Sequence, residues 1–131
     1  MTEQSRNLSI LAFSACLVML TSCTQDKQKL SSPEACASLE LVLHRAEVSW
    51  PVANQRITTS SSEAIIDGFE DVAVQTQGDM RATLDAWIGG FRLVSPYLVA
   101  NDFEGAKKAI NDVQEEIILL ANTNLATLCH W

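Results

Sequence analysis

Beyond residue 32, apolar residues recur every three or four positions, and this period restricts the chain to helices. A first stripe runs from Cys36 through Leu39, Leu43 and Ala46 to Trp50. Such spacing places side chains on one face of an α-helix. No stretch alternates polar and apolar residues as a half-buried strand would. The sequence therefore predicts an all-α domain.

Helix start signals recur along the chain. Ser31-Ser32-Pro33-Glu34 combines a capping serine, a proline at the first helical position and an acid in the first turn. Ser60 and Glu63 have the spacing of a capping box. Ser95-Pro96 repeats the cap-plus-proline pattern, and we expect Asn101-Asp102 to cap the last helix.

These signals predict a small bundle of four antiparallel segments, at residues 33–57, 61–77, 79–100 and 102–129. The later apolar stripes comprise Ile66, Phe69, Ala73, Thr76, Met80, Thr83 and Trp87, and then Ala106, Ile110, Val113, Ile117, Leu120, Asn124 and Leu128. We place the break between the second and third segments near Gly78. A break at Gly89-Gly90 is the alternative, and it would leave a short third segment.

The N-terminal region carries a separate signal. Residues 1–7 are polar and include Arg6, and an apolar run follows from Leu8 to Leu20. As a helix this run would rise about 20 Å, which is short of a hydrocarbon core of about 30 Å. The run is therefore typical of a cleaved signal peptide rather than of a permanent membrane span.

Directly after this run, Leu20-Thr21-Ser22-Cys23 resembles the lipobox of bacterial lipoprotein signal peptides. The resemblance implies that a signal peptide at 1–22 is removed and that Cys23 is acylated. Residues 23–32 would then be a lipidated cysteine with a flexible tether, and 33–131 the helical domain. The expected location is extracytoplasmic, anchored to the cell membrane or the outer membrane. The overall layout also resembles small single-disulfide helical lipoproteins of actinobacteria and their phages, many of which have no assigned function.

Export leaves two cysteines, because Cys16 would leave with the signal and Cys23 would carry lipid. Cys36 and Cys129 then form an even pair in an oxidising compartment, which favours a disulfide over two separate thiols. A bridge requires α-carbons within about 7 Å. In an up-down bundle the start of the first helix and the end of the last helix lie at the same end of the bundle only when the number of segments is even. A bridge between Cys36 and Cys129 therefore favours four segments over three.

Charge and motifs narrow the range of functions. The formal net charge is −7, so nucleic acid is a poor partner. We find no nucleophile with a recognisable base, no phosphate-binding loop and no zinc spacing, and we expect neither an enzyme nor a cofactor. Glu40 and His44 share a helix face and could ligate a metal, although a solvated ion pair is the simpler interpretation.

The expected function is a membrane-anchored binding or interaction module of the cell envelope. Its partners would be the lipid bilayer, through acylated Cys23, and an envelope protein. The alternative is a carrier of a small hydrophobic or cationic ligand within the bundle. Polar residues inside the stripes could line such a site: Thr76, Thr83 and Asn124, together with Met80. They could equally satisfy one another in the core.

Overall fold

The computed structural model describes residues 29–52, 55–112 and 115–131, and all regular secondary structure in these ranges is helical. The helices are α2 (Ser32–Arg45), α3 (Thr59–Val74), α4 (Gly78–Val99), α5 (Phe103–Asp112) and α6 (Glu115–Cys129). The expected all-α class is confirmed. The predicted signal peptide, Cys23 and the tether up to residue 28 lie outside the described residues.

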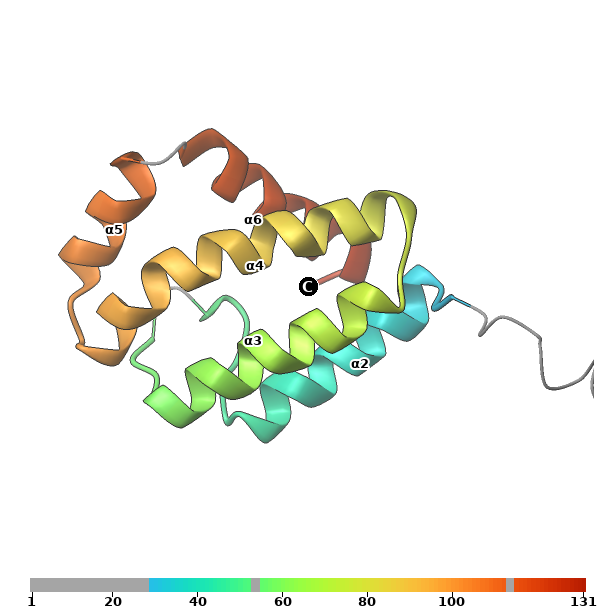
Figure 1. The fold of residues 1–131 in the computed structure, drawn as a ribbon, viewed down its shortest axis with the longest axis horizontal. Helices are drawn as coiled ribbons and strands as arrows, with labels where there is room; N and C mark the ends of the chain where they lie inside the picture. The colour runs from blue at the N-terminus through green and yellow to red at the C-terminus, as the bar shows by residue number, and fades with distance from the viewer. Residues whose placement is uncertain (1–28, 53–54, 113–114) are drawn as a thin grey trace, which may run out of the picture.

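Four helices enclose the core, and α5 lies beside them. Helix α2 packs on α3 and α6, and α4 packs on the same two helices, while α5 packs mainly on α4. Consecutive bundle helices run in opposite directions (Figure 1). The largest fully buried side chains come from all four bundle helices: Phe69, Leu39, Ile65, Leu84, Leu98 and Leu125. The four-segment bundle is therefore confirmed.

The predicted disulfide joins the first turn of α2 to the last residue of α6. The α-carbons of Cys36 and Cys129 lie 5.3 Å apart, and 93 positions separate the two residues in sequence. The bond holds the outer helices of the chain side by side, which is the arrangement expected for an even number of segments.

The first helix starts as the sequence predicts, whereas the second does not. Ser31 caps α2 in a capping box with Glu34. The backbone N–H and the hydroxyl of Ser31 both donate to the Glu34 carboxylate, and these hydrogen bonds lower the pKa of Glu34 below its usual value. The capping box expected at Ser60 and Glu63 is wrong. Thr58 caps α3 instead, and its hydroxyl accepts the N–H of Ser61 at 3.0 Å.

Helix α2 is shorter than the predicted segment 33–57. It ends at Arg45 because Glu47 adopts a left-handed backbone, with φ of 56°. The N–H of Glu47 then donates to the carbonyl of His44, and that of Val48 donates to Leu43. This pair of bonds is a Schellman motif, which satisfies the last carbonyls of a helix.

The break between α3 and α4 falls at Gly78, which has φ of +62° and begins α4. The alternative break at Gly89-Gly90 is wrong, since α4 runs through both glycines. The helix start expected at Ser95-Pro96 is also wrong, because α4 continues to Val99 with Pro96 inside it. Ser95 is buried in the core, and the packing of this face offsets the one backbone hydrogen bond that proline removes.

The last segment divides into α5 and α6, and its predicted stripe is only partly correct. Asp102 caps α5 as expected, accepting the N–H of Gly105 at 2.8 Å. Ala106 is buried, but Ile117, Leu120 and Asn124 are exposed, and Val113 lies outside the described residues. The buried residues of α6 are Ala121 and Leu125. A stripe read through 102–129 assumes one continuous helix, whereas α5 and α6 each have their own phase.

Within the ranges described, no helix combines the length and hydrophobicity needed to cross a bilayer.

Removal of the disulfide should destabilise the domain strongly. We expect the double substitution Cys36→Ser/Cys129→Ser to lower the free energy of unfolding by about 2–5 kcal/mol, because the reduced chain gains the entropy of a long open loop. Urea unfolding measures the change, with the wild-type protein in excess reductant as the matched control. A loss below about 1 kcal/mol in both samples would contradict this role.

Substitution by alanine at two glycines should have opposite effects on the stability of the fold. A Cβ at Gly68 of α3 would lie 2.6 Å from Cγ1 of Val42 on α2, whereas a Cβ at Gly89 would meet nothing within 4 Å. We expect Gly68→Ala to destabilise the protein by about 1–3 kcal/mol through overpacking. Gly89→Ala should stabilise it by up to about 1 kcal/mol through helix propensity.

Urea unfolding again provides the measurement. Adding Val42→Ala to Gly68→Ala should recover part of the loss, because it removes the methyl groups that the new Cβ meets. Equal stability of the two single variants would show that α2 and α3 do not depend on this close approach.

Candidate functional site

Two neighbouring hollows open beside α4, the first between α4 and α5 and the second where α4, α5 and α6 meet. The first has a volume of about 410 Å³ and is lined by Val94, Leu98, Phe103, Glu104, Ala106, Lys107 and Ile110. The second, of about 100 Å³, is lined by Val52, Trp87, Gly90, Phe91, Val94, Ile110, Ile118, Leu119 and Asn122. Val94 and Ile110 belong to both, so the hollows adjoin. Together they form what we call the α4–α6 groove, and most of its lining is apolar.

The floor of the second hollow belongs to the aromatic core. The ring of Trp87 stacks on Phe91 with centroids 5.0 Å apart, and it lies 4.5 Å from Phe69 and 5.7 Å from Trp50. The Nε1–H of Trp87 donates to Oδ1 of Asn122 at 3.3 Å. This bond links α4 to α6 beneath the groove and satisfies the polar edge of the indole.

The first half of α6 adds apolar surface beside the groove. Ile117, Leu119 and Leu120 are 51%, 52% and 57% exposed, and we call these three the α6 apolar face. Ile118 turns the other way and packs on α4, where it would lie 3.1 Å from a Cβ at Gly90. Leu119 also lines the second hollow, so the face and the groove are continuous.

The N-terminal end of the described chain is fixed at the opposite end of the bundle from α5 (Figure 1). The backbone N–H of Leu30 donates to the carbonyl of Gln75 at 2.7 Å. Nζ of Lys29 donates to the carbonyl of Val74 at 3.0 Å. Both acceptors lie at the C-terminal end of α3, where a cation is favoured by the helix dipole.

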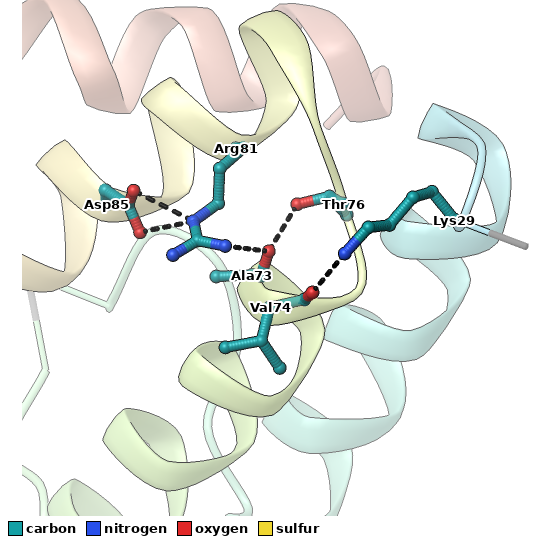
Figure 2. A network of polar contacts seen from close by, with 6 residues as sticks. All are labelled: Lys29, Ala73, Val74, Thr76, Arg81 and Asp85. Carbon is teal, nitrogen blue, oxygen red and sulfur yellow. Dashed lines mark hydrogen bonds and ion pairs between the residues drawn. The ribbon is translucent and has the colours of Figure 1, made fainter. Parts of the chain in front are cut away.

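The same end of α3 is held from α4 (Figure 2). The carbonyl of Ala73 accepts from Oγ1 of Thr76 at 2.8 Å and from Nη1 of Arg81 at 3.2 Å. The guanidinium of Arg81 also pairs with the Asp85 carboxylate at 2.9 Å. The hydroxyl of Thr76, a predicted ligand-lining group, thus satisfies a backbone carbonyl.

Three of the four predicted ligand-lining residues, Thr76, Met80 and Thr83, are buried, and Asn124 is exposed. Thr83 and Asn124 line a separate surface hollow of about 370 Å³ together with Asp79, Ala82, Thr127 and Leu128. The structure brings Thr83 and Asn124 together, whereas Thr76 and Met80 do not line that hollow.

Glu40, half of the proposed metal-ligating pair, has a contact of another kind. Its Oε1 accepts the indole N–H of Trp131 at 3.0 Å, and the Trp131 ring packs against Trp50 in a tilted arrangement with centroids 4.8 Å apart. Glu40 therefore helps to hold the end of the chain on α2. In the part of the chain that the structure describes, no three His, Cys, Asp or Glu side chains gather closely enough to hold a metal ion.

Sequence reasoning missed the groove, although a signal was present. Residues 117–120 read Ile-Ile-Leu-Leu, and four successive positions on a helix point in directions about 100° apart. One helix face cannot bury all four. An apolar run of this kind at the end of a short helix indicates a second, uncovered face.

Comparisons with models of protein families, with curated protein sequences and with solved structures give no match to this chain.

Proposed function

We propose that this protein is a lipid-anchored binding module of a bacterial cell envelope, held at Cys23 and binding a partner through the α4–α6 groove. The observation that carries the proposal is that the N-terminal end of the described chain and α5 lie at opposite ends of one bundle (Figure 1). A tether at one end and an open apolar groove toward the other are what such a module requires.

The anchor is supported by the lipobox-like sequence Leu20-Thr21-Ser22-Cys23 behind an apolar run of signal-peptide length. A diacylglyceryl group buries two acyl chains, at about 0.8 kcal/mol for each methylene, and two chains hold a protein stably on a bilayer. The hydrogen bonds of Leu30 and Lys29 to α3 support a fixed exit point for the tether.

The reach of the tether limits how far one end of the module can lie from the bilayer. From Cys23 to Lys29 the chain extends at most about 20 Å. With Cys23 acylated, the N-terminal end of the bundle stays within this distance of the bilayer, whereas α5 and the hollow beside it lie toward the other end (Figure 1).

The groove supports binding by its chemistry. Phe103 and the α6 apolar face expose large side chains beside a hollow that is mainly apolar. Contiguous apolar surface of this kind is typical of an interaction site. The charge of −7 adds solubility around it and disfavours anionic partners.

Lipidation is tested by expression in a bacterial host that processes lipoproteins, with an alkyne-labelled fatty acid in the medium. We expect the wild-type chain to incorporate the label, to begin at Cys23 by mass spectrometry and to sediment with membranes. Cys23→Ala should lose the label and this processing, because the acylated thiol is absent.

Cys16→Ala is the matched control, since Cys16 lies in the apolar run and leaves with the signal peptide. It should label and sediment like the wild type. A wild-type chain that keeps Met1 and takes up no label would overturn the anchored-module proposal.

A further inference from the structure

The α6 apolar face has no covering element within the described bundle. Its three side chains are each more than half exposed, while Ile118 between them packs on α4. A helix that is apolar on more than one side is normally covered on each of them. The first half of α6 is therefore apolar on two sides, as a helix buried on both sides would be, but only one of these sides is covered by the bundle.

The shape beside this face suits a helix. The α4–α6 groove is lined by residues of α4, α5 and α6, and Leu119 lies both in its wall and on the exposed face. Amphipathic helices bind in such grooves by inserting residues spaced three and four apart. Phe103 and Ile110 supply apolar contacts on the α5 side.

The charged residues of α6 are acidic. From residue 109 to residue 131 the sequence contains no Lys or Arg; Glu116 is exposed directly before the α6 apolar face, and Asp112 is exposed at the end of α5. The cations of α5 are Lys107, which lines the first hollow, and Lys108, which is exposed. A partner that covers α6 therefore gains from Lys or Arg beside its apolar face.

A second copy of the chain fits this surface poorly. In a two-fold contact, the same patch of each molecule faces the other. Pairing α6 with itself would bring Glu116 of both copies to one apolar contact, and like charges there are unfavourable. Anionic lipid is disfavoured for the same reason.

We propose that the α4–α6 groove and the α6 apolar face together receive an amphipathic helix with a basic flank, presented by another protein. This inference deepens the proposed function and rests on it for the use of the groove as a binding site. The apolar side of the incoming helix covers Ile117, Leu119 and Leu120, and its Lys or Arg side chains lie beside Asp112 and Glu116.

Two synthetic 18-residue peptides test the proposal. Both carry the same leucine stripe at spacings of three and four; one has lysine at its flanking positions and the other glutamate. Each is titrated into the full chain in nanodiscs of zwitterionic lipid. The indole N–H resonance of Trp87 reports occupancy, because Trp87 lines the groove and bonds to Asn122.

We expect the lysine peptide to shift the Trp87 resonance and to bind at least about tenfold more tightly than the glutamate peptide. Ile117→Ser/Leu120→Ser should weaken its binding by at least about tenfold, because the apolar contact is lost. Asp112→Asn/Glu116→Gln should reduce the preference for lysine over glutamate. These four side chains are exposed, so the fold should be retained.

Matched controls lie on other faces of the bundle. Leu41→Ser/Val74→Ser removes two side chains that are 54% and 55% exposed, and Glu63→Gln/Asp71→Asn removes two exposed acids of α3. Both should bind the lysine peptide within about twofold of the wild type. A loss equal to that of the α6 variants would overturn the assignment to this surface.

Three other results would also overturn the proposal: equal affinity for the two peptides, a Trp87 resonance that does not move, or a wild-type dimer that Ile117→Ser/Leu120→Ser dissociates. A Trp87 shift caused by zwitterionic vesicles alone would overturn it too, because it would assign the face to lipid.

Peptide binding is measured on the Cys23→Ala chain as well, so that this inference and the anchor are tested separately. Label uptake without peptide binding overturns this inference alone, and peptide binding without label uptake overturns only the anchor.

Discussion

The bond between Cys36 and Cys129 is the constraint on which the bundle depends. It joins the beginning of α2 to the end of α6, so the two outermost helices of the described chain must lie side by side. Helices α3 and α4 then close the ring, each packing against its neighbours in sequence. The hydrogen bonds of Lys29 and Leu30 to α3 lie at the same end. One end of the bundle is thus held by a covalent bond, while α5 covers part of the other.

Much of this fold follows from local rules. The apolar period predicts helices because only an α-helix brings every third and fourth residue to one face, and Cys36, Leu39 and Leu43 are buried as that rule requires. Gly78 marks the turn between α3 and α4 because its positive φ is unfavourable for other residues. The cysteine count adds the one long-range contact that local patterns cannot supply.

The first predicted segment, 33–57, is too long because periodicity does not distinguish a helix from a loop that packs on the core. Trp50 continues the first stripe, yet it lies beyond the Schellman motif that ends α2. Its ring packs at a tilt against Trp87 of the core and against Trp131. Val52 and Ile57 are buried from the same connection. Apolar residues in a loop that packs on the core can have the sequence spacing of a helix although the backbone there is not helical.

The run Ile-Ile-Leu-Leu at 117–120 indicates an uncovered helix face, but the sequence does not show where the groove beside that face lies. The position of the groove depends on the angle between α5 and α6 (Figure 1), and that angle follows from the division of one predicted segment into two helices. A continuous helix over 102–129 would bury Ile117 and Leu120 in the stripe. Helix α6 instead buries Ala121 and Leu125 and leaves Ile117 and Leu120 exposed. The uncovered surface is thus a product of the break.

The floor of the groove is also part of the core, and this has a consequence for recognition. Trp87 contacts Phe69, Phe91 and Trp50, and it bonds to Asn122 across the helix interface. A side chain entering the second hollow therefore meets groups whose positions are already set by the packing of α3, α4 and α6. Little ordering of the floor is needed on binding, so more of the free energy of apolar contact remains as affinity. By linkage, a partner bound there stabilises the folded bundle, since the unfolded chain presents no such surface.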